Sequence, residues 1–166
     1  TRRSSDLISA LVDITNYFTI DLARPLHVYD AKKLIGNLTV RGAKSGEKIK
    51  ALNGKEYALP EGACVISDDA QPLAIGGVIG GEHSGCEMDT TDIILEVALF
   101  DPAHVAATGR ALQIDSDARY RFERGVDPAF TPVGAEIATR MILDLCGGEA
   151  SNIVMAGKIP ETKRAI

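Results

Sequence analysis

The sequence has no tryptophan, few other aromatic residues and three cysteines in 166 residues. The core must therefore be mainly aliphatic. Cys64, Cys86 and Cys146 are odd in number and lack C-x-x-C spacing, which argues against a disulfide framework or a zinc site and fits reduced thiols. The longest apolar runs fall far short of a membrane span. We expect one cytoplasmic domain with no structural metal and no association with a membrane.

Basic residues are fewer than acidic ones. Lys and Arg number 18 against 23 Asp and Glu, so the net charge is −5. Non-specific binding to nucleic acid depends on basic residues that neutralise phosphates, so this composition is unfavourable for holding a duplex. A local basic cluster remains, and it fits either contact with a single phosphate or strand end, or a salt-bridged surface. Its members are Arg110, Arg119, Arg121 and Arg124.

Hydrophobic spacing predicts a mixture of helices and short strands. Helices are expected at residues 7–22 after a cap at Ser5 or Asp6, at residues 101–112 with Asp101-Pro102 as cap and first residue, and at residues 127–146 before Gly147-Gly148. Extended segments are expected at residues 25–30, 38–40, 47–51, 55–59, 64–66, 73–75 and 93–97, with a hairpin turn at Asn53-Gly54. This order, closed by residues 153–155, predicts the α+β class with mixed or antiparallel sheets and a few packed helices.

Residues 72–85 combine an apolar strand pattern with five glycines in ten residues. Glycine weakens a strand because it packs poorly and loses the most backbone entropy, so the backbone here is expected to line a ligand or a second strand. The run lacks the Lys-Ser/Thr of a phosphate-binding loop. It is either a pocket wall or a site of tight packing.

Two polar residues interrupt apolar segments. Glu96 lies in the most apolar stretch of the chain, where an ionised carboxylate needs a partner or a polar cavity; an arginine such as Arg121 or Arg124 is one possible partner. His27 is either a buried core residue or part of a site, and Asn16 on the first helix either faces water or joins that site. The residues alone predict a cavity lined by glycine backbone, one Glu and one His, with its ligand open.

Five sequence blocks carry a resemblance to a known family. They are residues 11–17, 24–30, 76–85, 94–96 and 121–128, with the sequences LVDITNY, RPLHVYD, GGVIGGEHSG, ILE and RFERGVDP. In this order and spacing they resemble the B3/B4 module of the bacterial phenylalanyl-tRNA synthetase beta subunit, over about residues 8–157. The resemblance implies a module at residues 1–157 whose start falls inside the family's domain, and a linker at residues 158–166 toward a following module.

The resemblance implies an editing domain that hydrolyses misacylated Tyr-tRNA(Phe). The parent synthetase is an α2β2 enzyme that charges tRNA(Phe) with phenylalanine, and its ATP and magnesium belong to the alpha subunit, so no cofactor is expected here. The implied partners are the 3′ end of tRNA(Phe) and the alpha subunit. Two alternatives remain: a non-catalytic structural or tRNA-binding module of the synthetase, and a stand-alone small-ligand binding protein.

The resemblance also assigns the site residues. Glu96 corresponds to the glutamate that recognises tyrosine, His27 to the editing-site histidine and Asn16 to a nearby polar residue, while Gly80 forms the pocket wall and Ser116 and Ala118 flank the ester. Ser116 stands where a threonine is common, and the chain departs from the family pattern at four further positions. Ala23-Arg24 replace a frequent Gly-Gln, Gln113 a usual glycine, and Arg119 a usual serine.

Overall fold

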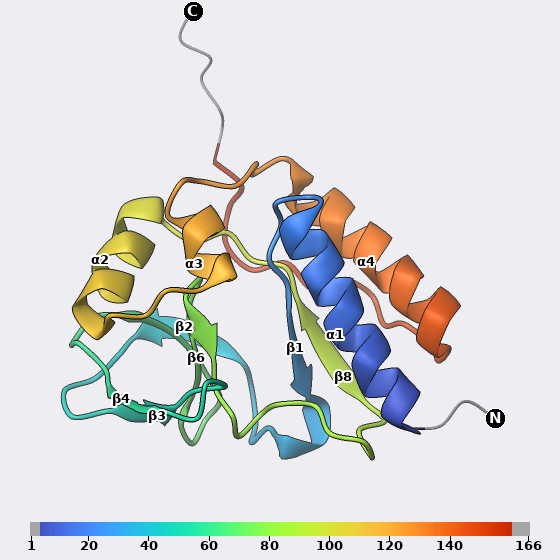
Figure 1. Cartoon of the computed structure of the whole chain (residues 1–166), viewed down its shortest axis with the longest axis horizontal. Helices are drawn as coiled ribbons and strands as arrows, with labels where there is room; N and C mark the ends of the chain where they lie inside the picture. The colour runs from blue at the N-terminus through green and yellow to red at the C-terminus, as the bar shows by residue number, and fades with distance from the viewer. Residues whose placement is uncertain (1–3, 161–166) are drawn as a thin grey trace, which may run out of the picture.

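The computed structural model describes residues 4–160, and their helices and antiparallel strands form an α+β fold as predicted (Figure 1). The helices are α1 (Ser4–Ile20), α2 (Pro102–Leu112), α3 (Asp117–Phe122) and α4 (Phe130–Cys146), with a short 3-10 helix, η1 (Ala31–Lys33). The strands are β1 (His27–Asp30), β2 (Thr39–Gly42), β3 (Lys48–Lys50), β4 (Glu56–Ala58), β5 (Cys64–Ser67), β6 (Pro72–Ile75), β7 (Ile79–Gly80) and β8 (Ile93–Glu96). None of the helices in this described part is long and apolar enough to cross a membrane.

The strands form three antiparallel sheets. One has four strands in the order β2-β5-β6-β7, and another is the β3-β4 hairpin around Asn53-Gly54. The third is a two-stranded ribbon of β1 and β8, in which His27 pairs with Glu96 and Tyr29 with Ile94. The ribbon joins residues 63 to 69 positions apart in the chain into one surface.

The two faces of the ribbon have different surroundings. Helices α1 and α4 lie side by side and cover one face (Figure 1), where Leu26 and Leu95 pack against the cluster of Ile14, Phe18 and Ala138. Side chains alternate across a strand, so His27 and Glu96 point away from these helices. The neighbouring Leu95 therefore serves the helix layer, and the Glu96 carboxylate belongs to the opposite face.

The second and larger core lies under the four-stranded sheet, the hairpin and helices α2 and α3. Aliphatic residues dominate it, as the composition predicts, with Phe100 and Phe122 in edge-to-face contact at 5.0 Å between ring centroids. Tyr29 also belongs to this core and is fully buried. The β1–β8 ribbon thus separates two apolar clusters.

Several helix boundaries differ from the expected ones. Helix α1 already includes Ser4, before the predicted cap, and it ends at Ile20. Helix α2 matches its prediction, because the Asp101 carboxylate accepts a hydrogen bond from the His104 amide at 2.8 Å. Helix α4 begins at Phe130 rather than at Asp127-Pro128, because the Asp127 carboxylate accepts the Ala129 amide in a separate turn.

Three elements were not predicted, η1 among them, and one segment forms no element. Helix α3 has six residues, too few for a helical period to emerge, and β7 has two residues inside the glycine run. Residues 153–155 form neither helix nor strand, and their side chains are exposed. The expected module start and linker fall partly at residues 1–3 and 161–166, outside the described residues.

Ala23 and Gln113, which stand where the family often has glycine, adopt backbone conformations that favour glycine. Ala23 has φ +50° and Gln113 φ +54°, and Gln113 is the left-handed C-cap of α2. We expect Ala23→Gly and Gln113→Gly each to raise the free energy of unfolding by about 0.5–1 kcal/mol, since a Cβ is strained in this region. Denaturant unfolding measures this, with Ala107→Gly in the middle of α2 as the matched control that should lower stability. A loss of stability in both variants would contradict this account of the two loops.

Arg24 and Arg119, which also depart from the family pattern, form hydrogen bonds that hold the same two loops. Arg24 is fully buried and donates from Nη1 to the Asp127 carbonyl at 3.3 Å, which ties the start of β1 to the entrance of α4. Arg119 donates from Nη1 to the Ile114 carbonyl at 2.5 Å and packs on Gly109. These arginines therefore fix the α1–β1 and α2–α3 connections.

Candidate functional site

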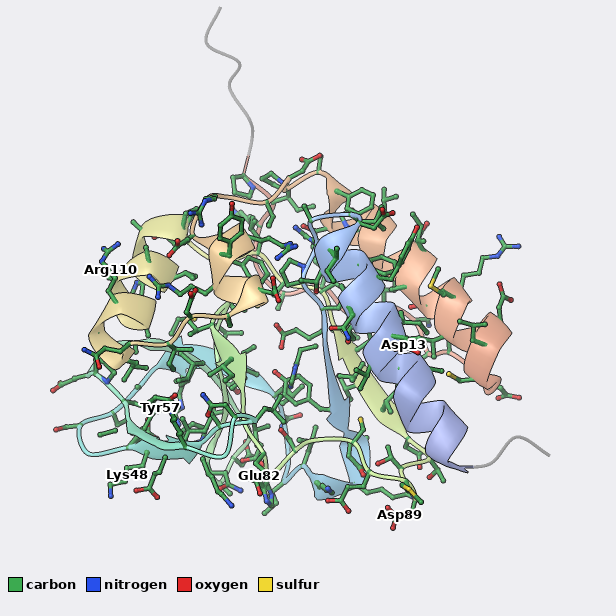
Figure 2. The ribbon with its side chains drawn as sticks, viewed as in Figure 1. Asp13, Lys48, Tyr57, Glu82, Asp89 and Arg110 are labelled. Carbon is green, nitrogen blue, oxygen red and sulfur yellow. The ribbon has the colours of Figure 1, made fainter. Side chains whose placement is uncertain are left out.

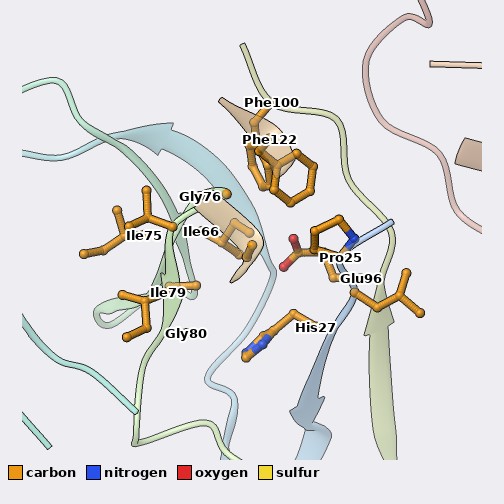
Figure 3. Close-up of a pocket in the computed structure, with 15 residues that line it drawn as sticks. Pro25, His27, Ile66, Ile75, Gly76, Ile79, Gly80, Glu96, Phe100 and Phe122 are labelled. Carbon is orange, nitrogen blue, oxygen red and sulfur yellow. The ribbon is translucent and has the colours of Figure 1, made fainter. Parts of the chain in front are cut away.

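A cavity lies between the β1–β8 ribbon and the glycine-rich segment, with α3 and Phe100 at its end (Figure 3). Thirteen of its fifteen lining residues carry apolar side chains or none, and the two with polar side chains are His27 and Glu96. The lining residues are Pro25, Leu26, His27, Ile66, Ala74, Ile75, Gly76, Gly77, Val78, Ile79, Gly80, Glu96, Phe100, Ala118 and Phe122. The predicted cavity with glycine backbone, one Glu and one His is confirmed.

The glycine run forms one wall of this cavity through β6, a turn and β7. Gly77 has φ +70° in the turn, where a Cβ would be strained. Gly80 faces His27, and a Cβ there would overlap the imidazole, lying 2.9 Å from Nε2 and 3.0 Å from Leu52 Cδ1. Both expectations for the run therefore apply, because the glycines allow tight packing and in doing so shape a pocket wall.

His27 presents a ring nitrogen to the cavity. Its Nε2 is buried and has no hydrogen-bond partner among the described residues, and its ring packs edge-on against Tyr29 at 4.5 Å between centroids. Burial lowers the pKa of His27 to about 4, so the imidazole is neutral near pH 7. A neutral ring with an open nitrogen can hold a water molecule or a carbonyl group.

Glu96 ends β8, and its carboxylate points into the cavity from the side opposite the glycine wall (Figure 3). The Tyr29 hydroxyl donates a hydrogen bond to Glu96 Oε2 at 2.5 Å. Burial raises the pKa of Glu96 to about 7, and the Tyr29 hydrogen bond opposes that rise. The carboxyl therefore titrates close to neutral pH. Its environment suits an acceptor for a hydroxyl group inside an apolar pocket.

The alternative in which an arginine neutralises Glu96 is wrong. Arg121 pairs with Asp117 at 3.0 Å and Arg124 with Glu123 at 2.9 Å. The group that hydrogen-bonds the Glu96 carboxylate is the hydroxyl of Tyr29, two residues after His27 on the facing strand. Sequence reasoning missed Tyr29, although its alternation with His27 placed both on one face of the strand.

The basic cluster is largely salt-bridged. Besides those two pairs, Arg119 binds Glu123 at 2.9 Å, and Arg124 also stacks on the Tyr120 ring. The fourth member, Arg110, lies at the rim of the molecule in Figure 2, as do the charged residues Lys48, Glu82 and Asp89. The structure therefore shows a salt-bridged surface, the second of the two interpretations of this cluster.

The structure brings some predicted site residues together and leaves others apart. Ala118 lines the cavity from α3, beside His27, Gly80 and Glu96. Ser116 is outside the lining, where its hydroxyl accepts from the Arg119 amide at 3.0 Å and donates to the Val78 carbonyl at 2.5 Å. It fastens α3 to the glycine segment. Asn16 is exposed on α1 and does not line this cavity.

Comparisons with known proteins agree with the resemblance in the sequence. The family described as the B3/4 domain matches residues 2–147. The phenylalanine–tRNA ligase beta subunit of Cereibacter sphaeroides is 65% identical over 158 residues, and that of Paramagnetospirillum magneticum 59% over 159 residues. These matches cover 95% and 96% of the chain, which spans 20% of each relative's length.

Among solved structures, an N-terminal fragment of the phenylalanyl-tRNA synthetase beta-subunit from Pyrococcus horikoshii is similar in part. It has a TM-score of 0.47 and 13% identity, and the match covers 52% of this chain and 33% of that one. The family match, in contrast, extends over most of the sequence. The chain belongs to the B3/4 domain family.

Proposed function

We propose that this chain is the editing module of a phenylalanine–tRNA ligase beta subunit and hydrolyses Tyr-tRNA(Phe). One observation carries the proposal. Glu96 and His27 are neighbours in the β1–β8 ladder, and the carboxylate and the imidazole, whose Nε2 has no hydrogen-bond partner among the described residues, face the same apolar cavity. The relatives named above are beta subunits of this ligase. The parent enzyme would charge tRNA(Phe) with phenylalanine at another site.

An editing site separate from the synthetic site is needed because a hydrophobic pocket separates phenylalanine from tyrosine poorly. A pocket built for phenylalanine rejects a ligand with one added hydroxyl only weakly, so a separate site has to select for that hydroxyl. Here the apolar walls suit an aromatic ring, and Glu96 can accept the hydrogen bond of the tyrosyl hydroxyl. A phenylalanyl group would desolvate the carboxylate and give it no partner in return.

The reaction is the attack of water on the ester carbonyl, which releases tyrosine and the free 3′-terminal adenosine. We assign His27 the task of orienting the water or the carbonyl through Nε2. Gly80 leaves room for the ester, and the Ser116–Val78 hydrogen bond keeps α3 and Ala118 beside it. Contact of Asn16 with the aminoacyl-adenosine stays a prediction from the resemblance.

The partners and cofactors follow from this assignment. The module would hold the 3′ end of tRNA(Phe) and work beside the alpha subunit in a cytoplasmic α2β2 synthetase. A net charge of −5 fits a module that binds only the terminal aminoacyl-adenosine. Ester hydrolysis needs no ATP, so ATP and magnesium belong to the alpha-subunit site.

The decisive experiment measures deacylation of Tyr-tRNA(Phe) and Phe-tRNA(Phe) by the full chain. A minimal ester, 3′-O-tyrosyl-adenosine, serves as a second substrate that needs no tRNA body. We expect faster hydrolysis of both tyrosyl esters than of the phenylalanyl esters. Hydrolysis of neither tyrosyl ester above the protein-free rate would favour the non-catalytic module instead.

Replacing His27 with alanine should lower the deacylation rate only in part, by about tenfold, since a hydrogen bond to a water or carbonyl contributes roughly 0.5–1.5 kcal/mol. Because its pKa is about 4, His27 should also add no step to the rate profile between pH 6 and 7. Initial rates on Tyr-tRNA(Phe) test both points, with His104→Ala on the exposed surface of α2 as control. A covalent aminoacyl-enzyme trapped in the unaltered chain would instead make His27 a general base for a protein nucleophile.

A further inference from the structure

Tyr29 contacts both polar groups of the cavity without lining it. It is fully buried on β1, its hydroxyl donates to Glu96 Oε2 at 2.5 Å, and its ring packs edge-on against His27. The ribbon register places Tyr29 opposite Ile94, two residues before Glu96 and on the same face. Its hydroxyl therefore reaches the carboxylate diagonally across the ribbon.

We propose that Tyr29 is a positioning residue that holds one oxygen of the Glu96 carboxylate and leaves the other for the hydroxyl of the substrate. This inference rests on the proposed function and adds a determinant of its specificity. A carboxylate has two oxygens and about four acceptor positions, so one phenol does not saturate it. The Tyr29 phenol is the same chemical group as the one to be recognised.

The surroundings of Glu96 make this hydrogen bond important for its charge. The polar groups that face the carboxyl are Tyr29 and His27 on β1 and the Cys64 thiol on β5. The imidazole is neutral near pH 7, and the other groups that line the cavity with Glu96 are apolar side chains and glycines. Tyr29 thus provides the hydrogen bond that favours the ionised form, against the effect of burial.

Tyr29 itself stays a donor throughout the physiological range. Burial and the neighbouring Glu96 carboxylate raise the pKa of its hydroxyl far above the ordinary value. Loss of this donor should let the carboxyl rotate and keep its proton to higher pH. A protonated carboxyl no longer offers the charged acceptor that separates a tyrosyl from a phenylalanyl group.

The first test needs no substrate. Carbon-13 NMR of the glutamate carboxyls in the full chain follows the titration of Glu96, with Glu96→Gln to assign the signal. In Tyr29→Phe we expect the Glu96 midpoint to move up by about one pH unit, as loss of a hydrogen bond to the charged form requires. The matched control is Tyr57→Phe on the β3–β4 hairpin, whose hydroxyl accepts a hydrogen bond from Asn53 and which does not line the cavity; it should leave the midpoint in place. An unchanged midpoint in Tyr29→Phe overturns the proposal.

The second test measures deacylation of tyrosyl and phenylalanyl esters after subtraction of the protein-free rates. Tyr29→Phe should lower the tyrosyl-to-phenylalanyl rate ratio by about tenfold at pH 7 and by less at pH 8.5, where Glu96 ionises again. An equal loss on both esters at both pH values would leave Tyr29 a packing residue only. An unchanged or higher ratio would also overturn the proposal.

The two tests separate this inference from the proposed function. If the unaltered chain hydrolyses neither ester, the editing function fails. The NMR titration still decides whether Tyr29 controls the Glu96 carboxyl. If the unaltered chain edits normally and Tyr29→Phe behaves like Tyr57→Phe in both tests, only the role of Tyr29 is lost.

Discussion

Replacing Glu96 with alanine is expected to cut hydrolysis of Tyr-tRNA(Phe) ten- to a hundredfold while hydrolysis of Phe-tRNA(Phe) changes little. The physical reason is the loss of a hydrogen bond to a charged acceptor, worth about 1.5–3 kcal/mol in a buried site. Glu96 is the charged side chain that points into the cavity, so no other lining residue can replace it. Parallel deacylation assays on the two aminoacyl-tRNAs measure the ratio directly.

The titration of Glu96 also predicts how the free energy of unfolding depends on pH. Its pKa in the folded chain, about 7, lies above the ordinary value of 4.5, so its ionisation weakens the folded state. The stability that protonated Glu96 gives is fully present below about pH 4.5 and is lost as the pH rises through 7. Glu96→Gln should therefore gain stability relative to the unaltered chain above pH 7.

The matched control for Glu96→Ala is Glu56→Ala. Glu56 lies exposed on β4, pairs with Lys48 at 3.0 Å and does not line the cavity. A folded Glu96→Ala chain with unaltered discrimination would make Glu96 a structural partner of Tyr29 and place selectivity elsewhere.

Filling the space at Gly80 should abolish editing almost completely. Even one Cβ there would overlap the His27 imidazole, and the indole of Gly80→Trp would occupy the place assigned to the ester. We expect a loss of about a hundredfold or more, the scale that displacement of a reacting group by 1 Å can cause. Deacylation of Tyr-tRNA(Phe) measures the loss for Gly80→Ala and Gly80→Trp.

A loss of fold has to be distinguished from a loss of access. Overpacking in a well-packed region costs about 1–3 kcal/mol, so denaturant unfolding accompanies each assay. Gly42→Ala on β2 is the control, since its added Cβ would meet Gly62 only at ordinary van der Waals distance, 3.4 Å from the Gly62 Cα. Full activity in a folded Gly80→Trp chain would remove Gly80 from the pocket wall.

Local sequence signals predicted most of the fold. Apolar runs located the buried strands, Asn53-Gly54 located the β3–β4 hairpin, and Asp101-Pro102 located the start of α2. The sequence pattern did not predict helix α3, because six residues span less than two turns and show no helical period. Its cap, Ser116, could have revealed it, since the hydroxyl accepts the amide three residues ahead.

The site was predictable where a residue contradicted its surroundings. Glu96 and His27 are conspicuous because polar groups in apolar strands need an explanation. Phe100 and Phe122 line the same cavity but are equally typical of a core, so no local signal marks them. The Tyr29–Glu96 hydrogen bond joins residues 67 positions apart, and only the strand register brings them together.

The two sides of the cavity belong to different sheets, and this has a mechanical consequence. His27 and Glu96 are direct partners in the β1–β8 ladder, so the spacing between them is set by backbone hydrogen bonds. Gly80 belongs to the other sheet, which shares no strand with that ribbon. The width of the cavity between them thus depends on packing between two sheets, and α1 and α4 cover the ribbon on its other face. Repacking of these helices is therefore expected to change the width of the cavity while the ladder keeps His27 and Glu96 paired.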